Sequence, residues 1–177
     1  GLLHFDQKKI LPPLKQLDPQ NVIYIGSLSK FLGSTTKIGW ISAPLAVLDK
    51  LSTARQDLDL TLSIFPQVLA KDALSDASFP DKIKELRQQI RDRHAYFFDK
   101  IGDSLSSRRP LGGFYVWVRL NPEKNLTKQL DQLMAAGILC LPSFIFGDKT
   151  PAIRLNIARL PFSEIDDLVE TLRQIIV

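Results

Sequence analysis

Hydrophobic positions along the first part of the chain form two short runs that are typical of strands. Residues 21–26 and 37–43 are rich in Ile, Val, Tyr and Trp, and turn residues bound both runs. Residues 30–36, which lie between the two runs, are too few for a crossover helix. We therefore expect the two strands to pair in an antiparallel or hairpin-like manner.

The middle of the chain has apolar residues at helical spacing. Residues 44–76 show this spacing on both sides of Pro66, and Pro66 suits the first turn of a second helix because a first-turn residue needs no N–H partner. After Pro80, residues 81–105 continue the pattern as one helix that is long enough to link two domains. Residues 1–20 carry proline turn signals and are predicted to be irregular.

The last third of the chain alternates strand and helix patterns. The predicted strands are residues 113–119, 138–141 and 152–158, and the predicted helices are residues 126–136, ended by Gly137, and 163–176. Ser163 and Asp166 resemble a capping box at the start of the final helix, and Tyr115 and Trp117 alternate along one strand face as expected of core residues. Strands mixed with helices predict an α/β chain whose last part is an α+β layer.

Composition is that of an ordinary globular protein. The 177 residues are 45% hydrophobic and 24% charged, which suits one large domain or two small ones. No apolar run is long enough to span a bilayer and the first residues lack a signal-peptide pattern, so we expect a cytoplasmic protein without a membrane partner. The single cysteine, Cys140, excludes an internal disulfide, and its apolar neighbours predict a core position.

Charge gives little support for direct nucleic-acid binding. The net charge of +4 comes from 23 basic and 19 acidic residues, and the basic residues are scattered. The densest basic stretch, residues 87–94, lies in a helical pattern that also carries acids, so a solvated helix face explains it better than a phosphate-binding stripe. His4 and His94 are far apart and no cysteine cluster exists, so no metal site is expected.

The candidate chemistry begins where the first predicted strand ends. There the sequence reads Ser27-Leu28-Ser29-Lys30. A lysine at this point is either a surface charge at the end of a strand or a side chain held at a site. The residues that follow distinguish the two interpretations.

Four ordered segments resemble those of the fold-type I pyridoxal-phosphate aminotransferases (class I/II). The serine and lysine segment, followed by Lys37-Ile-Gly-Trp40, resembles the cofactor-lysine segment of that family. Residues 112–117 resemble its small-domain strand, residues 137–143 a later turn, and residues 153–156 its carboxylate-binding strand. The resemblance covers nearly the whole chain and implies the C-terminal part of a PLP-dependent transferase fold.

The resemblance also implies a role for each candidate residue. Lys30 is the catalytic lysine, which condenses with the aldehyde of pyridoxal 5'-phosphate in a partly buried site and later moves the α-proton of the substrate. Hydroxyls of Ser27 and Ser29 and the charge of Lys37 serve the cofactor phosphate. Arg154 binds the substrate carboxylate with its planar fork.

Asn156 is the last candidate residue. It lies two residues after Arg154 on the same strand face, so both a structural hydrogen bond and a substrate contact are open to it.

Two positions depart from the family pattern. Lys37 stands where the family usually has arginine, so bidentate phosphate binding is lost. Ser34-Thr35 stand where the family has Pro-Gly, which predicts a less rigid turn.

The resemblance predicts which part of such a protein the chain represents. In the family, the acid that pairs with the pyridine nitrogen, the stacking aromatic residue and the glycine-rich loop precede the lysine, whereas only 29 residues precede Lys30 here. We therefore expect residues 1–79 to be the C-terminal remnant of the large PLP-binding domain and residues 80–177 to be the small domain with a long linking helix. We expect the chain by itself to be catalytically inactive.

Three functions of the intact protein are compatible with the resemblance. Residues 11–26 resemble the corresponding segment of MocR/GntR-type regulators, which favours an effector domain whose DNA contact lies in an N-terminal domain outside this chain. Aminoadipate and kynurenine aminotransferases share much of that segment, so an enzyme that moves amino groups between an amino acid and a 2-oxo acid is the alternative. A third interpretation is a dimerisation module. The family builds each site from two subunits, which implies a homodimer and an amino acid or related small molecule as ligand.

Overall fold

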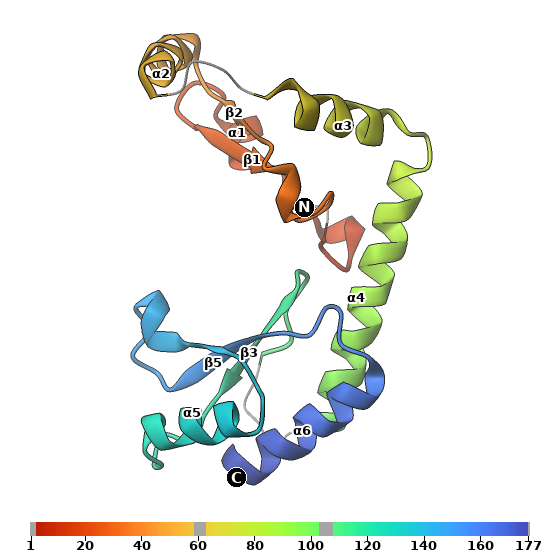
Figure 1. Cartoon of the computed structure of the whole chain (residues 1–177), viewed down its shortest axis with the longest axis vertical. Helices are drawn as coiled ribbons and strands as arrows, with labels where there is room; N and C mark the ends of the chain where they lie inside the picture. The colour runs from red at the N-terminus through yellow and green to blue at the C-terminus, as the bar shows by residue number, and fades with distance from the viewer. Residues whose placement is uncertain (1–2, 59–62, 103–107, 177) are drawn as a thin grey trace. The chain divides into compact units, whose positions relative to one another are not determined.

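The computed structural model describes residues 3–58, 63–102 and 108–176, which form a mixed helix and strand structure (Figure 1). The helices are α1 (Leu14–Leu17), α2 (Leu45–Leu58), α3 (Ile64–Ser75), α4 (Phe79–Ile101), α5 (Leu126–Ala135) and α6 (Phe162–Ile176). The strands are β1 (Tyr24–Ser27), β2 (Gly39–Ser42), β3 (Tyr115–Arg119), β4 (Leu141–Pro142) and β5 (Ala152–Asn156). Short 3-10 helices are η1 (Gln7–Lys9), η2 (Ser34–Thr36) and η4 (Ser143–Phe146).

The chain divides into two compact units. The first comprises Lys8–Lys84, and the second comprises residues 3–7 and 85–176. The division falls inside α4, the long green helix of Figure 1, between Lys84 and Glu85. The first unit, called here the lysine unit, contains β1 and β2. The second, called here the arginine unit, contains β3, β5 and β4.

The sheet of the lysine unit has two strands. β1 and β2 pair in antiparallel fashion from Tyr24 opposite Ser42 to Ser27 opposite Gly39, which confirms the predicted pairing. A Cβ atom on Gly26 would lie 2.2 Å from the ring of Trp40, which is directly opposite. Glycine at this position therefore allows the indole ring to lie against the neighbouring strand.

The helices predicted from apolar spacing are present. Pro66 lies in the first turn of α3, which begins at Ile64. Pro80 is the second residue of α4, where its missing N–H costs no intrahelical bond. The end predicted for this helix, at Leu105, lies outside the described residues.

The sheet of the arginine unit has three antiparallel strands in the order β3-β5-β4. The predicted strand 138–141 is wrong over its first three residues, because only Leu141 and Pro142 pair with β5. Gly137 adopts a left-handed φ of 76°, and the N–H of Ile138 donates to the Leu133 carbonyl at 2.9 Å. Residue 138 therefore closes α5 and does not extend β4.

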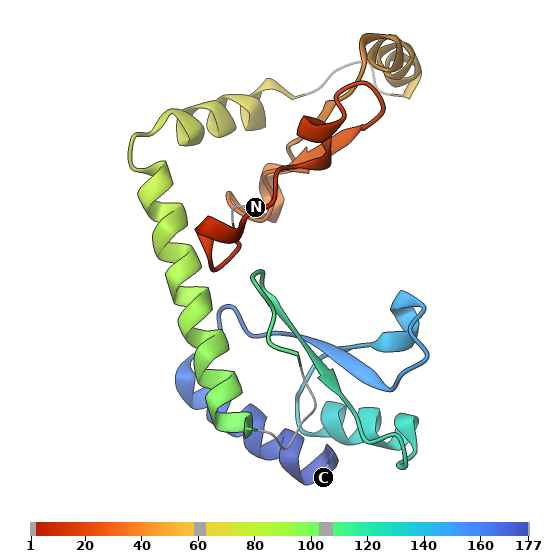
Figure 2. The ribbon, with the colours of Figure 1, turned by 180° about the vertical axis from the view of Figure 1, so that it is seen from behind.

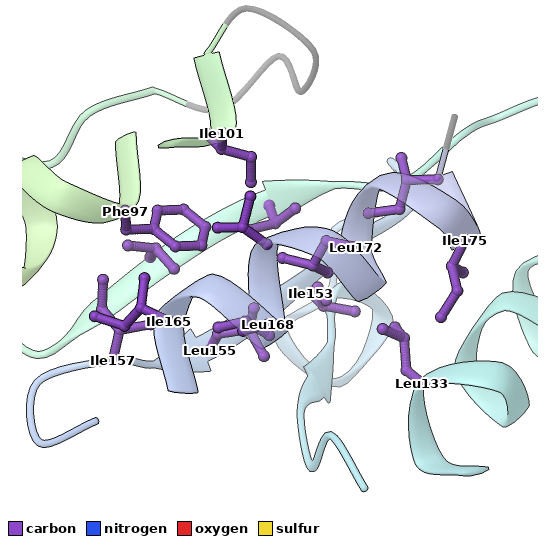
Figure 3. Close-up of a cluster of buried hydrophobic side chains, with 14 of the residues drawn as sticks. Phe97, Ile101, Leu133, Ile153, Leu155, Ile157, Ile165, Leu168, Leu172 and Ile175 are labelled. Carbon is purple, nitrogen blue, oxygen red and sulfur yellow. The ribbon is translucent and has the colours of Figure 1, made fainter. Parts of the chain in front are cut away.

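A hydrophobic core lies on one face of this sheet, and α5, α6 and the last turns of α4 cover it (Figures 2 and 3). Side chains from all these elements are fully buried, among them Phe97, Leu133, Ile153, Ile165 and Leu172. The last helix has a polar side facing solvent and an apolar side facing the sheet, as its sequence spacing predicts.

The capping box predicted at Ser163 is wrong. The helix already begins at Phe162, and the N–H of Ile165 donates to the Pro161 carbonyl at 3.1 Å. The Tyr96 hydroxyl instead donates to the Asp166 carboxylate, 2.9 Å from one oxygen and 3.0 Å from the other. The same carboxylate forms an ion pair with Lys100 at 3.0 Å. The side chain predicted to cap α6 therefore connects α6 to α4.

The first described residues belong to the arginine unit. His4 forms an antiparallel bridge with Gly112, and the N–H of Phe5 donates to the Leu111 carbonyl at 2.8 Å. The segment predicted to be irregular thus contains a short strand-like contact, as well as η1 and α1. None of the described helices is both long and apolar enough to cross a membrane, and the described part of the chain holds no group of three or more metal-ligating side chains.

Candidate functional site

Lys30 lies in a tight turn that follows β1. Leu28, which is buried, anchors this turn: its N–H donates to the Ile38 carbonyl at 3.0 Å, and its own carbonyl accepts from Phe31 and Leu32 at 2.9 Å. Lys30 itself is exposed within the lysine unit. The partial burial that the sequence argument expected for this amine is therefore not supplied by its own unit.

Two serine hydroxyls lie together beside the lysine. The Oγ atoms of Ser27 and Ser29 are 3.2 Å apart, and the N–H of Ser29 donates to the Ser27 Oγ at the same distance. A hydroxyl can rotate its proton towards an anionic oxygen. This pair can therefore donate hydrogen bonds to one anionic group next to Lys30.

Lys37 is the fourth candidate residue in this unit, after Ser27, Ser29 and Lys30. The pairing of β1 with β2 continues through the Leu28 to Ile38 hydrogen bond, which brings residue 37 next to the turn that holds Lys30. Lys37 has a left-handed φ of 45°, the one positive φ of a residue other than glycine in the described ranges. Such a conformation is uncommon for lysine and marks a tight reversal of the chain. It follows η2, which contains Ser34 and Thr35.

Arg154 lies on the central strand of the other sheet, on the face opposite the core. Its guanidinium carbon is 4.3 Å from the ring centroid of Tyr115 and 4.7 Å from that of Phe146. Over the ranges that the structure describes, Arg154 has no hydrogen-bond or ion-pair partner. A half-buried guanidinium with its donors unpaired is suited to a planar anion such as a carboxylate.

The aromatic residues of β3 are not core residues, contrary to the expectation from their alternation. Val116 and Val118 are fully buried, whereas Tyr115 and Trp117 are only half-buried and lie on the Arg154 face. The alternation was identified correctly, but the hydrophobic face of the strand is the valine face. Sequence reasoning missed Phe146; the signal available was an aromatic run, Phe144-Ile-Phe146, after the Pro142 landmark.

Asn156 is exposed at the end of β5. Its Oδ1 accepts a hydrogen bond from the N–H of Ala158 at 3.1 Å. The structural hydrogen bond that the sequence left open is therefore present. The predicted site residues form two groups, with Ser27, Ser29, Lys30 and Lys37 in the lysine unit and Arg154 and Asn156 in the arginine unit.

Comparison with known proteins gives one family. Residues 5–172 match the family model described as aminotransferase class I and II. The chain is 28% identical over 162 residues to the uncharacterized HTH-type transcriptional regulator YisV of Bacillus subtilis, covering 88% of this chain and 33% of that protein. It is 32% identical over 174 residues to aromatic-amino-acid aminotransferase 1 of Thermococcus litoralis, covering 93% of this chain and 41% of that protein.

A solved structure shows the same fold. LysN, an alpha-aminoadipate aminotransferase from Thermus thermophilus complexed with N-(5'-phosphopyridoxyl)-L-leucine, superposes with a TM-score of 0.87 at 24% identity, over 99% of this chain and 47% of that chain. The chain therefore has the fold of part of an aminotransferase, and it spans less than half the length of the proteins it matches.

Proposed function

Because the chain belongs to the aminotransferase class I and II family, we propose that it is a pyridoxal 5'-phosphate-binding, aminotransferase-like effector domain of a MocR/GntR-type transcriptional regulator. The observation that carries the cofactor assignment is the paired hydroxyls of Ser27 and Ser29 directly beside Lys30. The phosphopyridoxyl ligand in the LysN structure supports the same cofactor.

The residues of the lysine unit fit the chemistry of this cofactor. A phosphate monoester needs several hydrogen-bond donors and a cation, and Ser27, Ser29 and Lys37 provide them within one unit. Lys30 provides the primary amine that an aldehyde requires. When bound, the cofactor would supply the electron sink that makes the α-proton of an amino acid removable.

The protein's own residues would bind and orient the ligand. Arg154 would pair its N–H donors with the two oxygens of the α-carboxylate, which fixes the orientation of the amino acid. Lys30 would accept the α-proton and return it, in the manner of a general base. Asn156 would maintain the end of β5 through its bond to Ala158, next to the carboxylate site.

Two observations favour a regulator. Regulators of the HTH type align with most of this chain, and the remaining length of those regulators leaves room for a DNA-binding domain. Lysine in place of arginine at position 37, together with Ser34-Thr35, weakens and loosens the cofactor site compared with the family pattern. A domain that only senses a ligand tolerates such changes more readily than a domain that must catalyse repeated reaction cycles.

An aminotransferase is the second candidate. It is favoured by the 32% identity to the Thermococcus litoralis enzyme, which covers 93% of this chain. In this case the intact protein would transfer amino groups between an amino acid and a 2-oxo acid.

One pair of assays on the intact protein separates the candidates. A regulator would bind promoter DNA in a manner that an amino acid or pyridoxal 5'-phosphate changes, and would show little amino transfer. An enzyme would transfer amino groups at a rate abolished by Lys30→Ala and would not bind DNA. Retention of the imine absorbance band in Lys30→Ala, measured without added amino acid, would contradict the role of Lys30 as the Schiff-base lysine in both cases.

The proposal also covers the domain organisation, oligomeric state and location of the intact protein. Residues 1–79 would complete a large cofactor domain, and residues 80–177 would form the small domain that carries Arg154. The intact protein would be a cytoplasmic homodimer, with an amino acid or related molecule as ligand. Since Lys30 is exposed in its own unit, the 177-residue chain would be inactive by itself.

A further inference from the structure

Arg154 is surrounded in a way that its proposed carboxylate role does not by itself explain. Both ring centroids that contact its guanidinium carbon, those of Tyr115 at 4.3 Å and Phe146 at 4.7 Å, lie well inside the distance of about 6 Å at which cation–π attraction acts. We propose that Tyr115 and Phe146 are positioning residues that fix the Arg154 guanidinium for a ligand carboxylate. This inference rests on the proposed carboxylate-binding role of Arg154.

The Arg154 side chain must be restrained if it is to present its N–H donors in one orientation. The side chain has several rotatable bonds, and ordering it costs up to about 2 kcal/mol of rotamer entropy. In many proteins an acidic neighbour provides the restraint, but none pairs with Arg154 in the described part of the chain. An acidic partner would also occupy the donors that a ligand needs. Ring faces restrain the guanidinium through its own face and leave its in-plane N–H donors available.

The strand register determines the position of the Tyr115 ring relative to Arg154. β3 pairs with β5 so that Tyr115 is opposite Asn156 and Trp117 is opposite Arg154. Tyr115 is therefore the diagonal neighbour of Arg154 on the same face of the sheet, a separation that an aromatic side chain can bridge. The register is fixed because a slip of one residue would turn the core-facing valines of β3 towards this face.

The 3-10 helix η4 places the second ring. Ser143, which is 1% exposed, begins this helix, and its Oγ accepts a hydrogen bond from the Ala152 N–H at 3.2 Å. Gly147 ends it with a left-handed φ of 77°, and the Trp117 and Phe146 rings meet edge to face at a centroid distance of 5.7 Å. Phe146 thus packs against Trp117 and belongs to a helix whose first residue is hydrogen-bonded to the start of β5.

The nitrogen and proton resonances of the Arg154 side chain in the 177-residue chain test the inference. Because the two rings lie this close to the guanidinium, their ring currents should shift the Arg154 Hε proton upfield, and restricted rotation should keep its signal resolved. Tyr115→Leu and Phe146→Leu should each move this resonance towards that of an exposed arginine. Tyr115→Phe should preserve it, because the ring and not the hydroxyl makes the contact.

The matched control is Phe144→Leu. Phe144 lies in the same 3-10 helix, is 59% exposed, and makes no ring contact with Arg154. This variant should leave the Arg154 resonance and the dispersion of the core signals unchanged. A variant that loses core dispersion has a folding defect, and its conservative partner, Tyr115→Phe or Phe146→Tyr, then provides the comparison.

Titration with benzoate, a simple planar carboxylate, links the geometry to binding. Each leucine variant should raise the benzoate Kd measured at the Arg154 resonance about tenfold, while Tyr115→Phe and Phe144→Leu stay near the original value. If benzoate shifts the Arg154 resonance but ring removal changes neither its position nor the Kd, the positioning role is overturned. If benzoate does not shift Arg154 in the unmodified chain, the proposed carboxylate role is overturned, and this inference with it.

Discussion

The lysine unit and the arginine unit differ in how completely each is packed. In the arginine unit, three helices and two strands contribute fully buried side chains to one core, among them Phe97, Leu133, Ile153 and Leu172. In the described part of the lysine unit, the only buried hydrophobic side chains are Leu28, Ala70 and Ile83. Many of its large apolar residues are instead exposed, including Leu11, Leu14, Ile25, Leu45, Ile64 and Phe65.

This difference means that the candidate residues of the two units are held to different degrees. Arg154 is already restrained by rings on a sheet that has its own core. Lys30 is exposed at the end of a two-stranded sheet, and such a sheet is marginally stable without further packing. The lysine unit therefore leaves exposed apolar side chains of the kind that marks an interaction surface.

The largest difference in unfolding free energy is expected between alanine substitutions of a core leucine and of an exposed leucine. Leu172→Ala should lower the free energy of unfolding of the arginine unit by about 2–5 kcal/mol, because it leaves a cavity in a packed core. Leu69→Ala, at a side chain that is 50% exposed, should change stability by about 0.5 kcal/mol or less.

Urea unfolding of single-tryptophan variants measures the two units separately. In a Trp40→Phe background, fluorescence reports Trp117 and hence the arginine unit; in a Trp117→Phe background it reports the lysine unit. Equal destabilisation by the two alanine variants would contradict the packing difference.

Acid should weaken the arginine unit through His94. This histidine is 3% exposed, and neither ring nitrogen has a partner with hydrogen-bond geometry among the described residues. Burial lowers the pKa of His94 from 6.5 to about 4; the Gly113 carbonyl acts in the opposite direction but is too weak to reverse the shift. Between pH 6.5 and about 4, His94 is protonated in the unfolded chain but stays neutral in the folded chain. The free energy of unfolding is therefore highest above pH 6.5 and decreases as the pH falls towards 4.

The expected loss is about 3 kcal/mol of unfolding free energy over this pH range. Urea unfolding at several pH values measures it, with His94→Leu expected to flatten the dependence and His4→Ala to leave it unchanged. A pH dependence that survives in His94→Leu would assign the effect to other groups.

A smaller effect should follow from Tyr96→Phe. The variant removes the hydroxyl that donates to Asp166 across the α4 and α6 contact, but it keeps the ring that packs against Phe162 at 4.9 Å. The remaining ion pair of Lys100 and Asp166 is solvent-exposed and screened, so the unit should lose much less stability than in Leu172→Ala. Unfolding of the Trp40→Phe background again gives the measurement; a loss as large as that of Leu172→Ala would contradict it.

Sequence reasoning predicted the elements whose signals are local. Proline positions and apolar spacing located α3 and α4 within two residues at their starts, and the short connection predicted the antiparallel pairing of β1 with β2. The resemblance predicted the family, and the family model matches residues 5–172.

Features set by tertiary contacts were not predictable. The run at 138–140 is apolar enough for a strand, but the hydrogen bond from Ile138 to Leu133 assigns it to the end of a helix. The aromatic face of β3 is not its core face, because Val116 and Val118 on the other face belong to the buried core. The contact of Phe146 with Arg154 joins residues on different elements, and no local pattern encodes it.

The most direct test of the account is to locate the cofactor on the intact protein that contains this chain. The protein is incubated with pyridoxal 5'-phosphate and reduced with borohydride, and the modified peptide is identified by mass spectrometry. The account predicts a single phosphopyridoxyl group on Lys30, absent in Lys30→Ala and still on Lys30, at lower occupancy, in Lys37→Ala. Modification of Lys37 or of scattered surface lysines, with Lys30 unmodified, would contradict it.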